Sequence, residues 1–314
     1  MSGEAGTPRL RGMTSRAGRG RRAQGIKGLA FTLPYVLGFL AVYLAPVGYA
    51  VWQSVHQQKR SGLGFGAPTT VFSGLANFTA VLRDSGFWSS LLRVLLIAAV
   101  EIPVVLGLAL VMALLLDSTK ARMAKYFRVA YLVPYMVPTV VATLVWLYLY
   151  SPVASPVIST VKHLGGTLDF FTPVNTYLSI GNVLVWEQTG FNMILIAAAL
   201  QAVPRELFEA ARIDGAGELR IAWSVKIPAV RPVLVLTGMF SIIGMLQLFA
   251  EPLILRQLAP QAIGTGFTPM QSIYQTAFST SNYDYAAAMS VVLALVTGIL
   301  AFAFYRLTNR RTAL

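Results

Sequence analysis

Long apolar stretches alternate with polar segments rich in arginine, glycine and serine along the whole chain. A bilayer core of about 30 Å needs roughly 20 mostly apolar residues in a helix, and six stretches reach that length. They cover residues 29–52, 89–116, 127–150, 177–202, 232–255 and 285–307. Because lipid offers no partner for backbone polar groups, each stretch is predicted to be helical. The pattern therefore predicts an all-α, polytopic membrane protein with six transmembrane helices.

The composition agrees with a chain that faces lipid. Hydrophobic residues make up 56% of the sequence and charged residues only 12%, and the mean hydropathy is +0.64. Soluble domains carry about 25% charged residues, so this chain has too little charge to cover a water-exposed surface. The sequence has no cysteine, which excludes disulfide bonds, thiolate metal sites and cysteine catalysis.

The basic residues are concentrated on one side of the predicted spans. The net charge is +13, which in a soluble protein would suggest a nucleic-acid partner. Nineteen of the 25 lysines and arginines fall in the N-terminal tail, in the segments after the second and fourth spans, and at the C-terminal end. Because basic loops remain in the cytoplasm, both termini are predicted to be cytoplasmic. The charge is thus a topology signal, and no nucleic-acid partner is expected.

The spans divide the chain into four predicted parts. Residues 1–28 form a basic tail without apolar periodicity, predicted to be disordered in the cytoplasm, where it can meet anionic lipid headgroups. Residues 29–88 hold the first span and an external segment, expected to be loop plus a short helix. Residues 89–307 form a five-helix core, and residues 308–314 form a cytoplasmic C-terminal tail.

The segment 203–232, between the fourth and fifth spans, combines acidic and basic residues. Pro204 suits the start of a helix, and Arg205–Ile213 is predicted to be a short one. Asp214-Gly215 is a turn signal, because glycine adopts the left-handed conformation without a steric penalty. A second short helix through about Ser224 is expected to end before Pro228. Without further information, the segment would be interpreted as a solvated amphipathic loop.

The residue string in this segment matches a family pattern. Glu209-Ala210-Ala211 is followed by three residues, Gly215, nine residues and then Val225-Lys226-Ile227-Pro228. The string resembles the "EAA" loop of the permeases of ATP-binding-cassette (ABC) importers, in the MetI-like group, with the pattern E-A-A, three residues, G, nine residues, I-x-L-P. The spacing is kept, and the hydrophobic residues at 225 and 227 differ from those of the family pattern. A match of this length in a loop of the right position is a specific signal.

Other segments resemble the sugar-type permeases of this family, and in particular the first permease of their pairs. These segments are Phe72-x-Gly74-Leu75-x-Asn77-Phe78, Phe87-Trp88, Trp186, Gly190-Phe191, Leu200-Gln201-x-x-Pro204, Gly244-x-x-Gln247-x-Phe249 and Tyr274-x-x-x-Phe278. Together they cover the chain from about residue 29 to residue 307. The resemblance implies a multi-pass permease of the bacterial cytoplasmic membrane that takes up a sugar or sugar derivative.

The resemblance also implies the partners. A second, related permease would complete the pathway, with a heterodimer favoured, and an external solute-binding protein would deliver the substrate. The sequence has no G-x-x-x-x-G-K-[ST] string, so ATP and Mg²⁺ are expected on a separate ATPase dimer and no cofactor on this chain. The chain is accordingly expected to be a transport subunit and not an enzyme.

In the family, the short helix that carries the EAA residues binds in a groove of the ATPase. The coupling residues implied here are Glu209, Ala210, Ala211, Asp214, Gly215, Ala216, Trp223 and Pro228. Glu209 would pair with a cation on the ATPase, and the alternative is a weak local pair with Arg205 or Arg212. Ala222 stands where the family often has an aromatic residue, and Trp223 follows it, so the docking is expected to differ locally.

Polar residues inside the spans are costly unless they face a cavity or a partner helix. The candidates for a substrate pathway are Glu187, Gln188, Asn192, Gln247, Phe249 and Glu251. Their amides and carboxylates suit a neutral polyhydroxyl ligand, and Trp146 and Trp186 are further candidates for contacts with a sugar ring. The alternative is hydrogen bonding between helices, which is the favoured interpretation for Glu101.

Three other functions remain open at this point. The same family includes importers of glycerol phosphate and other small solutes. An ion-coupled secondary transporter would use the buried carboxylates, but it does not account for the EAA loop. A membrane-embedded enzyme or receptor would need a cluster of histidine and acidic residues, which the sequence does not display.

Overall fold

The computed structural model describes residues 30–59, 69–117 and 123–309 of the chain. The predicted tail at 1–28 and residues 310–314 of the predicted C-terminal tail lie outside the described residues. The chain divides into two compact units, Met1–Gln53 and Ser54–Leu314.

The described part of the first unit is a single long helix. It runs over Ala30–Ser54, ends on the first residue of the second unit, and contains a π-helical turn, η1 (Leu40–Leu44), followed by α2 (Ala45–Ser54). Its large apolar side chains are exposed, including Phe31 at 90% and Tyr35 at 76%. An apolar helix with an exposed surface needs lipid or another helix around it. The predicted first helix is therefore confirmed.

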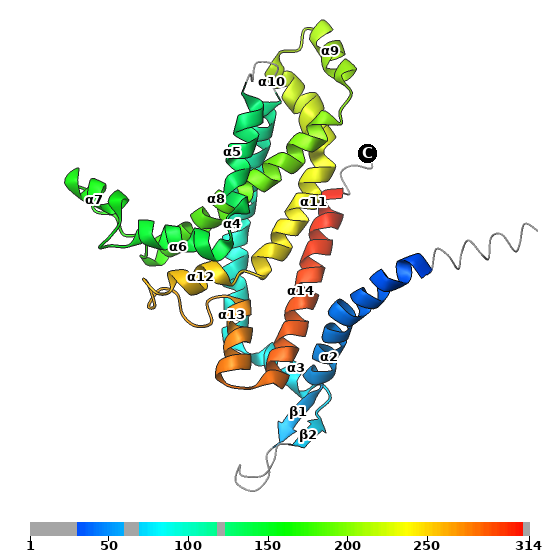
Figure 1. The fold of residues 1–314 in the computed structure, drawn as a ribbon, viewed down its shortest axis with the longest axis vertical. Coiled ribbons are helices and arrows are strands. Elements are labelled where there is room, and N and C mark those ends of the chain that lie inside the picture. The colour runs from blue at the N-terminus through cyan, green and yellow to red at the C-terminus, as the bar shows by residue number, and fades with distance from the viewer. Residues whose placement is uncertain (1–29, 60–68, 118–122, 310–314) are drawn as a thin grey trace, which may run out of the picture. The chain divides into compact units, whose positions relative to one another are not determined.

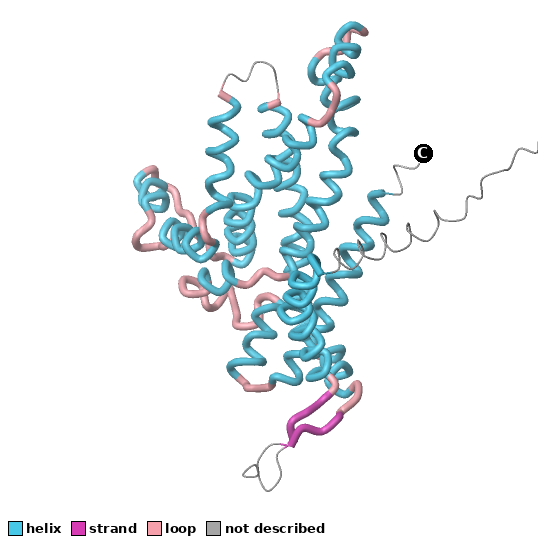
Figure 2. Tube along the Cα trace, turned by 45° about the vertical axis from the view of Figure 1, so that its right-hand side comes forward, coloured by secondary structure: helices cyan, strands magenta, loops and turns pink. Residues whose placement is uncertain are grey.

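The second unit is a helical bundle with one small β-hairpin (Figures 1 and 2). Its long helices are α4 (Ser85–Leu116), α8 (Pro173–Gln201), α11 (Ile227–Leu246) and α14 (Tyr283–Asn309). The shorter elements are β1 (His56–Lys59), β2 (Thr69–Phe72), α3 (Ala76–Arg83), α5 (Ala124–Met136), α6 (Thr139–Tyr150), α7 (Pro156–His163), α9 (Arg205–Ile213), α10 (Glu218–Ile221), η2 (Ala222–Lys226), α12 (Ala250–Leu255), α13 (Pro269–Tyr274) and η3 (Gln275–Ser279).

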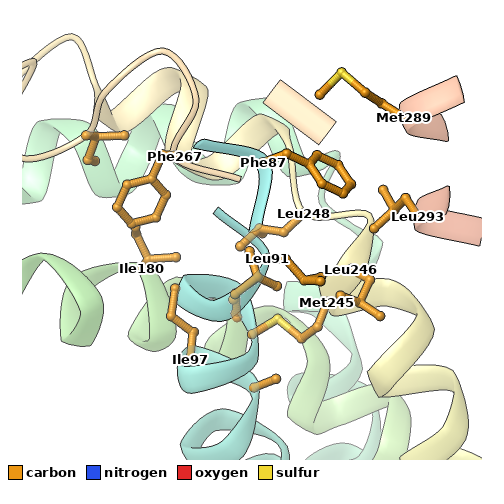
Figure 3. Close-up of a cluster of buried hydrophobic side chains, with 14 of the residues drawn as sticks. Phe87, Leu91, Ile97, Ile180, Met245, Leu246, Leu248, Phe267, Met289 and Leu293 are labelled. Carbon is orange, nitrogen blue, oxygen red and sulfur yellow. The ribbon is translucent and has the colours of Figure 1, made fainter. Parts of the chain in front are cut away.

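One core joins the four long helices at the end of the unit that carries the hairpin. Phe87, Leu91 and Ile97 lie at helical spacing on one face of α4 and are buried. They belong to one cluster with Ile180 of α8, Met245 and Leu246 of α11, and Met289 and Leu293 of α14, which Figure 3 shows converging. A second cluster, around Ala109 and Ala113 of α4 and Met193 and Ile196 of α8, holds the other halves of these two helices together.

The β-hairpin departs from the expected all-α fold. β1 and β2 pair antiparallel, with His56 opposite Phe72 and Lys59 opposite Thr69. The buried side chain of Asn77 in α3 fixes the hairpin: its Nδ2 donates to the carbonyl oxygens of Ser54 (2.9 Å) and His56 (2.8 Å). The expected short helix is present as α3, but the strands were missed.

The predicted third span is not one straight helix. α5 and α6 meet at a bend of 92°. Val137 precedes Pro138 and is extended (φ −75°, ψ 129°), because a residue before proline is sterically pushed out of the helical region. At about 1.5 Å per residue, neither α5 nor α6 alone reaches across a 30 Å core. The expectation of a continuous helix at 127–150 is therefore wrong.

The predicted fifth span is also interrupted. α11 ends at Leu246, residues 247–249 are not helical, and α12 begins at Ala250. Pro252 has no N–H to bond the carbonyl of Leu248, and its ring would clash with that carbonyl in a continuous helix. Proline is tolerated in the first turn of α12, where the missing N–H would have no helical partner.

At its other end, α11 is longer than expected. α10, η2 and α11 follow one another without a break, so the second short helix of the loop does not stop before Pro228. The π-helical turn lets the helix pass the proline, because the N–H of Ile227 bonds the carbonyl of Ala222, five residues back.

Five described helices are long and apolar enough to cross a membrane, or six if the bent pair α5–α6 counts as one span. The helices at 89–116, 177–202 and 285–307 agree with the structure to within about four residues, as boundary uncertainty allows. The fold is thus a mostly helical membrane protein, and the count of six spans remains a prediction.

Contacts between distant segments define two ends of the second unit. At one end, Lys226 Nζ lies 2.7 Å from Asp117 Oδ2 at the terminus of α4. At the other end, Arg93 Nη1 donates to the carbonyl oxygen of Phe267 (2.7 Å), and Tyr285 Oη donates to Asp84 Oδ2 (2.9 Å). The C-terminal end of α4 and the segment after α8 therefore lie at the same end of the unit.

Candidate functional site

A cavity of about 470 Å³ with both polar and apolar walls lies between α8, the α5–α6 bend and the α11–α12 break. All six predicted pathway residues line it: Glu187, Gln188, Asn192, Gln247, Phe249 and Glu251. They come from two segments about 60 residues apart in the sequence. Thr237, Ser241 and Gly244, which lie on the same face of α11, also line the cavity.

Both helix interruptions open onto this cavity. Tyr135, Val137 and Thr139 contribute from the α5–α6 bend, and residues 247–250 contribute from the α11–α12 break. Non-helical backbone at membrane depth is tolerated where it lines a cavity, because its polar groups need partners. The interruptions therefore place non-helical segments beside the polar side chains of the cavity.

The two carboxylates of the cavity are buried. Glu187 is 7% exposed and Glu251 is 8% exposed. Oε1 of Glu187 has no hydrogen-bond partner among the described residues. Asn192 Nδ2 donates to the carbonyl oxygen of Gln188 at 2.9 Å. A ligand with hydroxyl donors would satisfy the carboxylate oxygen that the protein leaves unpaired.

Aromatic rings form the apolar part of the wall. Phe249 lines the cavity, and so do Phe191 and Phe240, which the sequence-based list of pathway residues missed. Tyr135 and Phe191 stack with ring centroids 4.4 Å apart. Trp146 and Trp186 do not line the cavity but pack against each other at 6.0 Å. The expected role of these two tryptophans in a sugar site is therefore not supported by their position.

Glu101 lies outside the cavity. It is 3% exposed, and neither of its carboxylate oxygens has a hydrogen-bond partner among the described residues. It lines a separate, mostly apolar pocket of about 550 Å³ between α4 and α8. Within the described part of the chain, a hydrogen bond from another helix to Glu101 is thus not formed.

The loop at 203–232 projects from the end opposite the hairpin (Figure 1). α9 matches the predicted bounds, and Gly215 has a φ of +78°. Gly215 N donates to the carbonyl oxygen of Arg212 (3.0 Å), and Ala216 N donates to that of Ala211 (2.9 Å). These two bonds form a Schellman motif, in which a left-handed glycine satisfies the last carbonyls of a helix. The predicted short helix and glycine turn are confirmed.

The predicted coupling residues lie on the outside of this loop. Glu209, Ala210, Asp214, Gly215, Trp223 and Pro228 are exposed, and Ala211 and Ala216 are half-buried. α9 has no buried residue. Three large apolar side chains nearby, Ile213, Leu219 and Trp223, are 87%, 75% and 67% exposed. A cluster of exposed apolar side chains is typical of a protein–protein interface.

Glu209 does not form the local ion pair considered from the sequence. Arg212 instead pairs with Glu218 across the glycine turn, with Nη2 2.9 Å from Oε1. Both side chains of that pair are largely exposed, so it contributes little to stability. The carboxylate of Glu209 forms no salt bridge within the described residues and can accept a bond from another molecule.

The family model described as "Binding-protein-dependent transport system inner membrane component" matches residues 70–314. The diacetylchitobiose uptake system permease protein NgcF of Streptomyces coelicolor is 32% identical over 327 residues, covering 95% of this chain and 88% of that protein. The lactose transport system permease protein LacF of Rhizobium radiobacter is 27% identical, covering 93% and 97%. The trehalose transport system permease protein SugA of Mycobacterium tuberculosis is 30% identical, covering 89% and 88%.

The fold has also been seen in solved structures. A bacterial ABC transporter involved in the import of the acidic polysaccharide alginate contains a chain that superposes with a TM-score of 0.75 at 20% identity, covering 92% of this chain and 99% of that chain. The family model spans most of the sequence, and the Streptomyces permease is similar over nearly its full length. The chain therefore belongs to the family of binding-protein-dependent transport system inner membrane components.

Proposed function

We propose that this chain is the permease subunit of an ABC importer and that the cavity at the interrupted helices is its half of the pathway for a sugar or sugar derivative. The single observation that carries the proposal is the convergence of six polar or aromatic pathway residues and two helix interruptions on one cavity. Relatives named for lactose, trehalose and diacetylchitobiose transport support a carbohydrate as the cargo.

The chemistry of the cavity suits a carbohydrate. Carboxylates and amide oxygens accept hydrogen bonds from sugar hydroxyls, the amide nitrogens donate to them, and aromatic faces pack against the apolar faces of sugar rings. The volume of about 470 Å³ lies within the range of about 300–1,000 Å³ for small-molecule sites. Since this chain supplies one wall, a second permease subunit, in a heterodimer, would supply the opposite wall.

The exposed side chains of the loop at 203–232 support the binding of a partner protein at this second functional surface. In the proposed assembly, α9 and the apolar side chains Leu219 and Trp223 dock into an ATPase dimer that holds ATP and Mg²⁺. The loop end is accordingly cytoplasmic, with both termini, and the hairpin end faces an external solute-binding protein. Cycles of ATP binding and hydrolysis then alternate the access of the cavity between the two sides of a bacterial cytoplasmic membrane.

A substitution pair tests whether the cavity carries the substrate. Glu187→Gln keeps the shape of the side chain but removes a buried acceptor oxygen, so we expect uptake and substrate-stimulated ATP hydrolysis to fall by about tenfold, the loss of one buried hydrogen bond to a charged group. Gln247→Ala is expected to act in the same direction. The measurements are uptake of a labelled carbohydrate panel in cells that lack the native copy, and ATP hydrolysis by the purified complex.

Glu101→Gln is the matched control, because Glu101 is also a buried glutamate with unpaired oxygens but lies outside the cavity. We expect its uptake per assembled complex to equal that of the unmodified protein. Equal loss of uptake in Glu101→Gln and Glu187→Gln, or normal uptake in Glu187→Gln and Gln247→Ala, would contradict the assignment of the cavity.

A further inference from the structure

A buried lysine joins the exposed loop to the membrane helices. Lys226 is the last residue of η2 and is 7% exposed. Its Nζ lies 2.7 Å from Oδ2 of Asp117, the residue that follows α4. The two residues are 109 positions apart in the sequence, so the contact fixes the loop side of α11 to the end of a different long helix.

The same ammonium group also contacts α9. Nζ lies 5.2 Å from the centre of the ring of Phe208, on the side of α9 that is turned toward the bundle. This distance is within the range of a cation–π interaction. One side chain thus touches α9 and the end of α4 while belonging to the segment that leads into α11.

The contacts of Lys226 with Phe208 and Asp117 matter because α9 otherwise packs only weakly against the helical bundle. None of its residues is buried, and its Schellman turn is followed by the exposed pair of Arg212 and Glu218. Lys226, Phe208 and Asp117 line one polar pocket of about 490 Å³ between α9 and the ends of α4 and α8. Apart from the backbone at 202–204 that joins α9 to α8, movement of α9 can therefore reach the bundle through the few side chains that line this pocket.

We propose that Lys226 is a positioning residue that transmits movement of α9 to α4, by holding Phe208 on one side and Asp117 on the other. The proposal rests on the proposed function of the loop as the docking site of the ATPase. α4 packs on α8 through the cluster around Ala109, Ala113, Met193 and Ile196. Glu187 and Asn192 of α8 line the cavity. Movement of the loop can therefore reach the cavity through α4 and α8, which pack against each other.

The test uses the assembled importer with its ATPase and binding protein. Lys226→Met keeps most of the volume and removes the charge. We expect this variant to purify with the ATPase at the normal ratio and to hydrolyse ATP, while uptake, and the stimulation of hydrolysis by loaded binding protein, fall by about tenfold, as for the loss of a coupling contact. The double variant Lys226→Asp with Asp117→Lys restores the ion pair, and we expect it to recover uptake to within about threefold of normal.

Glu218→Gln is the matched control, because it removes an exposed ion pair of the same loop without breaking a link to the bundle. We expect normal uptake and normal stimulation for it. Normal coupling in Lys226→Met overturns the proposal. A complex that assembles in part, with normal uptake per assembled complex, overturns it as well, because the effect is then purely structural. If Lys226→Met does not assemble, Lys226→Arg and the double variant decide, and failure of both to couple overturns the proposal.

The proposed function fails in a different way. If the loop does not dock the ATPase, Glu209→Lys leaves co-purification of the ATPase unchanged, whatever Lys226→Met does. If the loop docks the ATPase but Lys226 does not transmit movement of α9, Glu209→Lys releases the ATPase. In that case Lys226→Met still shows normal uptake and normal stimulation of ATP hydrolysis.

Discussion

Gly215 shows how one residue sets the geometry of the exposed loop. Its φ of +78° lies in the left-handed region, which costs a non-glycine residue about 1–2 kcal/mol. Its N–H also bonds the carbonyl oxygen of Arg212, which closes the end of α9. A Cβ at this position would meet no other atom, so the requirement for glycine comes from the backbone conformation and not from crowding.

We predict a graded series at this position. Gly215→Ala strains the turn and should lower uptake several-fold, whereas Gly215→Pro cannot adopt a positive φ and loses the N–H, so it should abolish uptake. Both proteins should remain in the membrane, since no buried contact is lost. Uptake and membrane content are measured in the same cells.

Gly217→Ala is the control for this series. Gly217 has an ordinary extended conformation (φ −71°, ψ 164°) with no atom within 4 Å of an added Cβ, so its substitution should leave uptake unchanged. Normal transport by Gly215→Pro would exclude a coupling role for the turn.

The positions of the cavity residues followed from the sequence because polar groups in apolar spans are costly and therefore informative. Glu187, Gln188, Asn192, Gln247 and Glu251 stood out for that reason. Phe191 and Phe240 were missed as lining residues because an aromatic residue in an apolar span carries no such signal. Trp146 and Trp186 were named on residue type alone, and residue type does not determine which way a side chain points.

At the scale of elements, the helix interruptions were the main error. The stretches at 127–150 and 232–255 were each predicted to form one helix. Val137, which precedes Pro138, is instead extended, and residues 247–249, which precede the helical turn that holds Pro252, are not helical. Whether a proline kinks or breaks a helix depends on how neighbouring helices satisfy the freed backbone groups. That information is in the tertiary structure and not in the local sequence.

The packing of α5 on α8 also depends on a single glycine. A Cβ on Gly190 would overlap the carbonyl oxygen of Tyr131 in α5. Close approach of two helices at a small residue is typical of membrane proteins, and it holds α5 beside the cavity wall that Phe191 and Asn192 form.

We predict that Gly190→Ala destabilises the protein by about 1–3 kcal/mol, as overpacking does. The expected result is a lower temperature of thermal unfolding for the detergent-purified permease and less complex in the membrane. Gly181→Ala lies on the same helix with open space around the added Cβ and should unfold like the unmodified protein. Equal unfolding temperatures for both variants would show that α5 does not approach α8 this closely.

At the scale of the whole molecule, charge and hydropathy indicated a membrane protein, and the loop string indicated the family, which the comparisons confirmed. The hairpin at His56–Phe72 was not predicted, because four-residue strands are too short for a periodicity to be recognised. The strongly apolar helix at Ala30–Ser54 agrees with a chain that lies in a membrane.

In the proposed function, this chain transports a carbohydrate, and the hydrolysis of ATP on a partner subunit drives the transport. The most direct measurement is uptake of labelled carbohydrate into proteoliposomes that contain the purified complex, with ATP and an ion gradient supplied separately. We predict uptake that requires ATP and the binding protein, persists when ion gradients are collapsed, and disappears with Gly215→Pro. Uptake that proceeds without ATP and stops when the ion gradient is collapsed would instead show an ion-coupled secondary transporter.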